Sequence, residues 1–113
     1  GQSIVSNFLE SIENNNFKKI ILYGAGEVAD IFIDMISKHK LNLRVMALID
    51  DDENKIGQQI NNIPIISLDA INSIDHDGLI ITSYTFETKI LEKLNLINYP
   101  SDKIVKYFER EMD

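Results

Sequence analysis

The feature that most constrains the fold of this chain is an abrupt change of hydrophobic pattern around a pair of glycines. Residues 20–36 read IILYGAGEVADIFIDMI. The first part is a short run of branched apolar residues that ends at Gly24, which is typical of a buried strand. From Glu27 to about Lys38 the apolar residues recur at helical spacing, which indicates an amphipathic helix. The pattern therefore predicts a strand, a tight glycine turn and a helix in direct succession.

The same alternation of strand and helix patterns continues along the chain. Further strands are predicted within residues 43–50, 54–66, 77–83 and 102–108, and further helices at 3–14, 67–74 and 86–96. This order is typical of a parallel sheet with helices on both faces. The expected α/β fold is a three-layer α/β/α domain with a five-stranded parallel sheet in the order 3-2-1-4-5. In such sheets ligands bind beyond the carboxyl ends of the strands, here at the loops after the first and fourth strands.

The composition predicts one domain and excludes several classes of partner. A chain of 113 residues can form one core, so residues 1–113 are expected to be a single domain, excised from or partnering a larger protein. No run of about 18 apolar residues and no leader-like start is present, which predicts no membrane segment and a cytoplasmic location. The net charge is −7 and no basic stripe offsets it, so no nucleic-acid partner is expected.

The glycine turn matches the dinucleotide-binding pattern G-x-G-x-x-G/A. The matching residues are Gly24, Ala25, Gly26, Glu27, Val28 and Ala29. The first glycine permits the tight turn, the second lets the backbone approach a pyrophosphate, and the small last residue lets the helix pack on the strand. Backbone N–H groups that open the helix would then bind the phosphate. The charge of Glu27 competes with a phosphate here, so a turn without a ligand stays open as an alternative.

A run of three aspartates ends the second predicted strand. Asp50 lies 24 residues beyond Gly26, close to the spacing of the acid that binds the ribose in dinucleotide-binding folds. A carboxylate there accepts a hydrogen bond from the 2′-hydroxyl and repels a 2′-phosphate, so NAD is favoured over NADP. Asp51 is a second candidate, although Asp51 and Asp52 also fit a solvated turn. No histidine or glutamate stands at a spacing that supports a metal site, so no metal is expected.

Three polar residues follow the fourth predicted strand, beside the glycine turn. The hydroxyls of Thr82 and Ser83 could reach a phosphate or a sugar, and Tyr84 could stack on a ring. Alternatively, the two hydroxyls cap the next helix. Thr88 stands four residues after Tyr84, so the Tyr-x-x-x-Lys pair of short-chain reductases is absent. No combination of serine, histidine and acid has motif support, and no catalytic residue is predicted.

Two segments carry a resemblance to a group of bacterial enzymes. LYGAGEVADIF and ALIDDDENKIGQQINNIPIISLDAI resemble the nucleotide-binding domain of surface-polysaccharide enzymes. Two families are similar: the N-terminal domains of capsule-type nucleotide-sugar dehydratases and epimerases, and those of sialic-acid-type sugar acyltransferases. Their shared features are a glycine turn, paired aspartates, a lysine-and-glycine segment and a proline-containing strand, here Gly24 and Gly26, Asp50 and Asp51, Lys55 and Gly57, and residues 60–65.

The resemblance covers residues 18–108 and implies a Rossmann-like domain that binds NAD or a UDP-sugar in polysaccharide biosynthesis. The chain has Glu27 and Val28 where the acyltransferases carry a histidine, so its turn is closer to the dehydratase type. The catalytic domains of both families are absent from this sequence, and no catalytic residue can be transferred. The implied partners are a nucleotide-type small molecule and either a second copy of the chain or a fused catalytic domain.

Three functions remain open at this point. The first is a binding module without chemistry of its own, and the second is the cofactor-binding part of an NAD-dependent nucleotide-sugar dehydratase or epimerase. The third is a degenerate fold that acts as a structural or oligomerisation unit. The glycine turn recognises only phosphate, so the sequence does not separate one base or sugar from another.

Overall fold

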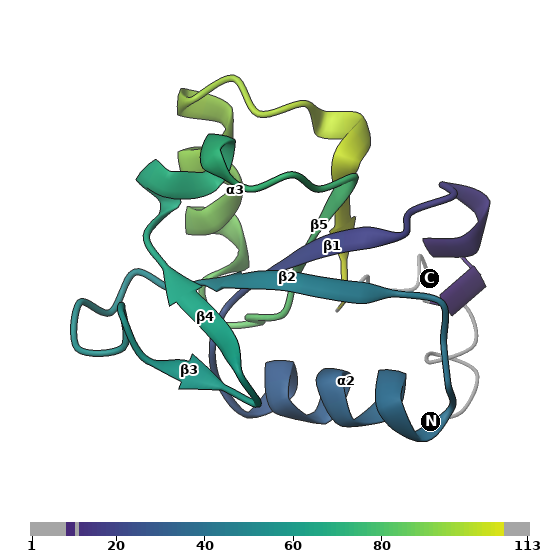
Figure 1. Cartoon of the computed structure of the whole chain (residues 1–113). Helices are drawn as coiled ribbons and strands as arrows, with labels where there is room; N and C mark the ends of the chain where they lie inside the picture. The colour runs from purple at the N-terminus through teal and green to yellow at the C-terminus, as the bar shows by residue number, and fades with distance from the viewer. Residues whose placement is uncertain (1–8, 11, 108–113) are drawn as a thin grey trace.

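One mixed sheet with helices on both faces organises the chain (Figure 1). The computed structural model describes residues 9, 10 and 12–107. In chain order the elements are β1 (Lys19–Tyr23), α2 (Glu27–Lys38), β2 (Arg44–Ile49), β3 (Gln59–Ile60), β4 (Ile63–Ile66), the 3-10 helix η1 (Leu68–Ser73), β5 (Gly78–Ile81), α3 (Glu87–Leu96), the 3-10 helix η2 (Ser101–Lys103) and β6 (Ile104–Lys106). A strand, a helix and a parallel strand follow one another from β1 to β2 and from β5 to β6.

The sheet has six strands in the order β3-β4-β2-β1-β5-β6. Every neighbouring pair from β4 to β6 is parallel, whereas β3 and β4 are antiparallel. The prediction of five strands, all parallel, in the order 3-2-1-4-5 is therefore wrong in the strand count and consequently in the order. Within residues 54–66, β3 and β4 form a hairpin instead of a single returning strand. Asn61 and Asn62 both take a left-handed conformation, with φ of 50° and 67°, which closes a two-residue hairpin turn.

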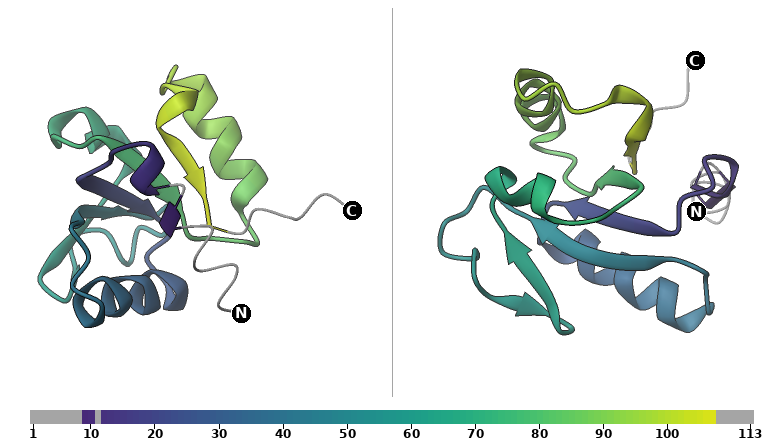
Figure 2. Two further views of the ribbon diagram at one scale, coloured as in Figure 1. Left: turned by 90° about the vertical axis from the view of Figure 1, so that its right-hand side faces the viewer. Right: turned by 45° about the horizontal axis from the view of Figure 1, so that its top comes forward.

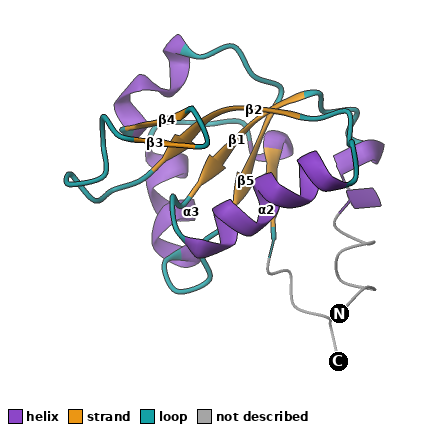
Figure 3. Cartoon of the chain, turned by 60° about the horizontal axis from the view of Figure 1, so that its bottom comes forward, coloured by secondary structure: helices purple, strands orange, loops and turns teal. Residues whose placement is uncertain are grey.

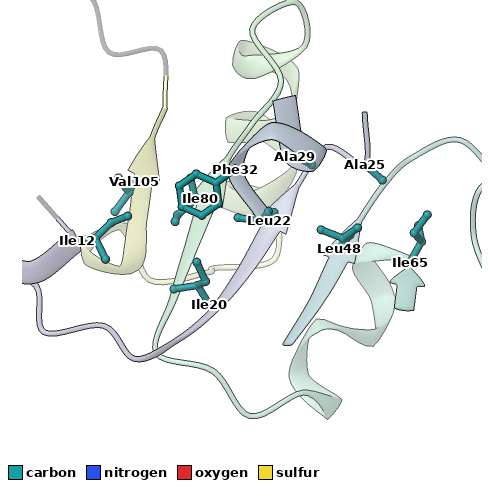
Figure 4. Close-up of a cluster of buried hydrophobic side chains, with 10 residues drawn as sticks. All are labelled: Ile12, Ile20, Leu22, Ala25, Ala29, Phe32, Leu48, Ile65, Ile80 and Val105. Carbon is teal, nitrogen blue, oxygen red and sulfur yellow. The ribbon is translucent and has the colours of Figure 1, made fainter. Parts of the chain in front are cut away.

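Side chains of the central strands alternate between two buried clusters, one on each face of the sheet. Ile20 and Leu22 of β1 share a cluster with Phe32 of α2 (Figure 4). Ile21 and Tyr23 belong to the opposite cluster, which includes residues of α3 and η1. Figure 2 shows α2 and α3 on opposite sides of the sheet, and Figure 3 shows α2 in front of the strands. This packing holds the carboxyl ends of β1, β2 and β5 at one edge of the sheet.

The predicted helices agree with the structure to different degrees. The helix predicted after the glycine turn is confirmed as α2, whereas the short helix predicted at 67–74 is the 3-10 helix η1. In the helix predicted at 3–14, residues 9, 10 and 12–14 are helical. Residues 3–8, 11 and 108 of the predicted elements lie outside the described residues. None of the helices that the structure describes combines the length and the apolar run needed to cross a bilayer.

Candidate functional site

A cavity of about 630 Å³ opens at the carboxyl ends of β1, β2 and β5. This volume lies within the range of small-molecule sites, about 300–1,000 Å³. The described residues that line it are Tyr23, Gly24, Ala25, Gly26, Glu27, Val28, Asp50, Asp51, Asp52, Lys55, Thr82, Ser83, Phe86, Lys89, Ile90 and Lys93. Nine of the ten residues predicted from the sequence are in this wall, whereas Tyr84 is outside it and 56% exposed. The structure thus brings nine predicted residues together, and their binding role stays a prediction.

The two glycines of the turn meet different structural requirements. Gly24 has a φ of +122°, and a Cβ added there would lie 3.0 Å from Oγ1 of Thr82. The fold itself therefore requires glycine at position 24. Gly26 has a φ of −120°, and beyond its chain neighbours no described heavy atom lies within 4 Å of where its Cβ would stand. No contact in the described part of the chain explains a glycine at position 26, where the bare backbone faces open space.

The N-terminus of α2 follows this bare backbone directly. The first N–H groups of an α-helix have no partner within the helix. Among the described residues, no side chain caps this end of α2. Glu27 and Asp30 place negative charge in the first turn, where it interacts favourably with the positive end of the helix. Open amides in a cavity wall can bind a phosphate, and the carboxylate of Glu27 opposes that binding.

Asp50 holds the glycine turn against the end of β2. Its Oδ2 accepts a hydrogen bond from the N–H of Ala25 at 2.8 Å, and its Oδ1 accepts one from the N–H of Asp52 at 2.8 Å. The ammonium of Lys55 lies 3.9 Å from Oδ2 and donates to the carbonyl oxygen of Ala25 at 3.2 Å. Asp50 and Lys55 therefore fix the position of the turn, whatever else they bind.

Asp51 connects the end of β1 to α3. Its Oδ1 accepts a hydrogen bond from the hydroxyl of Tyr23 at 2.7 Å, and its Oδ2 pairs with the ammonium of Lys93 at 2.9 Å. Burial raises the pKa of Tyr23, and the hydrogen bond and negative charge of Asp51 raise it further. Tyr23 therefore stays a protonated donor.

Within the part of the chain that the structure describes, no group of three acidic or histidine side chains could hold a metal ion.

The hydroxyls after β5 are partly occupied by the protein. Thr82 is buried, and its hydroxyl donates to the carbonyl oxygen of Gly24 at 2.8 Å. The carbonyl oxygen of Tyr23 lies 3.1 Å from the same Oγ1 and shares that proton. Ser83 Oγ accepts a hydrogen bond from the N–H of Phe86 at 3.3 Å, one residue before α3 begins. Thr82 therefore supports the glycine turn, and Ser83 fixes the approach to α3.

One wall of the cavity, provided by α3 and the residue before it, is not predicted from the sequence. Phe86, Lys89, Ile90 and Lys93 all line the cavity. Their spacing of three, four and seven residues places them on one face of a helix. This spacing was visible in the sequence. The structure adds that this face lies toward the glycine turn.

Comparison with known proteins identifies relatives of this chain. The family model described as C2185-like, N-terminal, matches residues 16–105. The redox-sensing transcriptional repressor Rex of Geobacillus sp. (strain WCH70) is 21% identical over 82 residues, which are 73% of this chain and 38% of that protein. The chain thus spans little more than a third of the length of this curated relative.

Two solved structures share the fold. UDP-D-quinovosamine 4-dehydrogenase from Vibrio fischeri superposes with a TM-score of 0.58 and 18% identity, covering 79% of this chain and 75% of that chain. The Rex-family repressor RSP in complex with β-NADH superposes with a TM-score of 0.60 and 15% identity, covering 96% of this chain and 55% of that chain. At these identities the likeness shows the fold, which is Rossmann-like.

The expectation that excluded nucleic acid as a partner is contradicted by another structure of RSP. In that structure RSP is in complex with β-NAD+ and operator DNA, and it superposes on this chain with a TM-score of 0.59. The expectation rested on a net charge of −7, which describes only the field of this chain. Because the chain covers 55% of RSP, its charge does not exclude DNA as a partner of a protein that carries such a domain.

Proposed function

The chain belongs to the C2185-like, N-terminal family, and on that premise we propose that its Rossmann-like domain binds the dinucleotide NAD or NADH. The observation that carries the proposal is the bare backbone at Gly26, beside the uncapped start of α2 and in the wall of the cavity. A dinucleotide needs this close approach of backbone to its pyrophosphate. The RSP complex with β-NADH supports the same class of ligand.

In the proposed complex the pyrophosphate lies against the first turn of α2 and the adenosine ribose lies beside Asp50. Each oxygen of the Asp50 carboxylate already accepts one backbone N–H. A carboxylate has about four acceptor positions, so it can accept a ribose hydroxyl as well. Its negative charge disfavours a 2′-phosphate, so NAD should bind more tightly than NADP.

A UDP-sugar is the second candidate ligand, in which case the domain serves surface-polysaccharide or capsule biosynthesis in the cytoplasm. The V. fischeri UDP-D-quinovosamine 4-dehydrogenase favours this candidate, because the chain covers 75% of that protein's chain. The resemblance of the glycine turn and the aspartate run to capsule-type dehydratases points the same way. With either ligand, residues 1–113 act as one binding domain, and the chemistry belongs to another domain or subunit.

Calorimetric titration of the wild type and Gly26→Val tests the proposal. The ligands are NAD+, NADH, NADP+, UDP and UDP-N-acetylglucosamine. The wild type should bind NAD+ or NADH more tightly than NADP+, and Gly26→Val should lose at least about tenfold in affinity because its side chain blocks the backbone amides. Ser37→Val is the matched control, since Ser37 is exposed near the other end of the same helix. Its affinity should equal that of the wild type.

Three outcomes would change the conclusion. Tighter binding of the UDP-sugar than of the dinucleotides would select the second candidate. Equal affinity of Gly26→Val and the wild type would contradict the phosphate site at α2. No binding of any of the five ligands at millimolar concentration would contradict nucleotide binding and leave the structural or oligomerisation unit.

A further inference from the structure

We propose that Phe86 stacks on the planar ring at the second end of the bound dinucleotide, which in NAD is the nicotinamide ring. The inference rests on the proposed function and deepens it by assigning a residue to one half of the ligand. Phe86 stands immediately before α3, in the wall of the cavity. In the sequence pattern Phe86 is only the first residue of a predicted helix.

The exposure of Phe86 is the first observation behind this proposal. Its side chain is apolar, yet the residue is 59% exposed. A flat ring that covers the phenyl face would remove apolar surface from water and add a favourable aromatic contact. Leu96, at the other end of α3, is 80% exposed but is not among the described residues that line the cavity. Position in the cavity wall, and not exposure alone, distinguishes Phe86.

The backbone of Phe86 is fixed on both sides, so its ring is attached to a rigid position. Its N–H donates to Oγ of Ser83 at 3.3 Å. Its carbonyl oxygen accepts a hydrogen bond from the N–H of Ile90 at 2.8 Å, and this bond closes the first turn of α3. Ile90 is itself a buried residue of α3. A binding residue held in this way loses little freedom when a ligand arrives.

The sheet order decides which half of the ligand lies beside Phe86. β1 pairs with β2 on one side and with β5 on the other. A ligand whose pyrophosphate lies at the turn after β1 therefore extends one nucleoside over the end of β2 and the other over the end of β5. Asp50 follows β2 and suits the adenosine ribose. The segment with Phe86 follows β5, so the nicotinamide half lies there.

ADP-ribose separates the two halves experimentally, because it keeps both phosphates and the adenosine but lacks the nicotinamide ring. Calorimetric titration of Phe86→Ala with NAD+ should show an affinity about 5- to 150-fold below the wild type, the range for loss of one stacking contact. The affinity for ADP-ribose should change by less than about twofold, since no ring is lost there. Leu96→Ala, on the same helix, is the matched control and should leave both affinities unchanged.

A tryptophan reporter gives a second, independent measurement. The chain contains no tryptophan, so Phe86→Trp introduces a single indole fluorophore at the proposed contact. NAD+ should quench its emission and ADP-ribose should not, whereas the emission of Leu96→Trp should respond to neither. Equal affinity of Phe86→Ala and the wild type for NAD+ overturns the inference while the proposed function stands. An equal loss for NAD+ and ADP-ribose also overturns it, and absence of any binding by the wild type overturns both.

Discussion

Two glycines at opposite ends of the parallel strands differ in their surroundings. The glycine at the amino ends of the strands is enclosed by the protein, whereas the glycine at the carboxyl ends faces open space. Gly78 begins β5, and a Cβ added there would lie 2.5 Å from the ring of Phe17. Gly26 opens α2, and no described heavy atom beyond its chain neighbours lies within 4 Å of its missing Cβ. The first glycine is explained by packing. The second has no packing contact of this kind among the described residues.

Carboxylates accept backbone N–H groups at both ends of the strands, as Asp77 and Asp50 do, and the two ends differ in the amides that begin α2. At the amino-terminal edge, Oδ2 of Asp77 accepts the N–H groups of Lys18 and Lys19, both at 2.9 Å, and Lys19 pairs with Asp75. At the other edge the amides that begin α2 have no side-chain cap among the described residues. Acids and glycines near strand ends therefore do not by themselves indicate a site. The proposed phosphate site is based on the amides that begin α2 together with the bare backbone at Gly26.

The largest effect on stability is expected for Gly78→Ala. The added methyl group overlaps the Phe17 ring, and overpacking of this kind costs about 1–3 kcal/mol of unfolding free energy. Urea denaturation measures this cost. Gly26→Ala is the matched variant and should cost less than about 1 kcal/mol, the loss expected at an N-cap position. In a Phe17→Leu background the cost of Gly78→Ala should shrink, because the two residues are in contact. Equal losses of unfolding free energy in Gly26→Ala and Gly78→Ala would contradict the difference between the two glycines.

A smaller loss of unfolding free energy, which depends on pH, is expected for Asp77→Asn. The backbone N–H groups of Lys19 and Lys18 lower the pKa of Asp77 below its ordinary value of 3.8. The unfolded chain therefore takes up the proton first as pH falls, and the stability that Asp77 adds above pH about 4 is lost at lower pH. Asp77→Asn should lose about 1 kcal/mol at neutral pH, a hydrogen-bond contribution reduced by solvent screening.

Urea denaturation of both proteins between pH 7 and pH 2 checks this prediction. The difference in unfolding free energy between the wild type and Asp77→Asn should be largest at neutral pH and should shrink below pH about 4. Asp75→Asn removes the same charge from an exposed ion pair at the same edge and should have a smaller effect. A difference that stays constant with pH would show that the Asp77 charge adds no stability.

The sequence predicts an element correctly where the residues of that element alone determine its structure. The bounds of α2 follow from a strong helical repeat after a glycine turn, and that helix is confirmed from Glu27 to Lys38. The β3–β4 hairpin was missed because β3 has two residues, too few for a strand pattern. Its signal was the pair Asn61 and Asn62, which tolerates left-handed conformations better than most residues.

Those parts of the candidate site that lie within one segment of the chain are predictable from the sequence. The contacts between distant segments are not. The glycine turn follows from its own sequence. The contact of Asp50 with the N–H of Ala25 joins residues 25 positions apart and has no local pattern. The cavity wall formed by Phe86, Lys89 and Lys93 depends on how the chain leaves β5 and enters α3, which helical spacing alone does not specify.

The smallest effect is expected for Glu27→Gln, and it should have opposite signs for stability and binding. The Glu27 carboxylate lies in the first turn of α2, so its loss should lower the unfolding free energy by about 0.3–1 kcal/mol. The same loss removes a negative charge beside the proposed phosphate and should raise the affinity for NAD+ about two- to fivefold. Asp34→Asn, an exposed charge further along α2, is the matched control for both measurements and should change neither by as much. Weaker NAD+ binding by Glu27→Gln would mean that the carboxylate contacts the ligand itself, and the open amides of α2 would then not be the phosphate site.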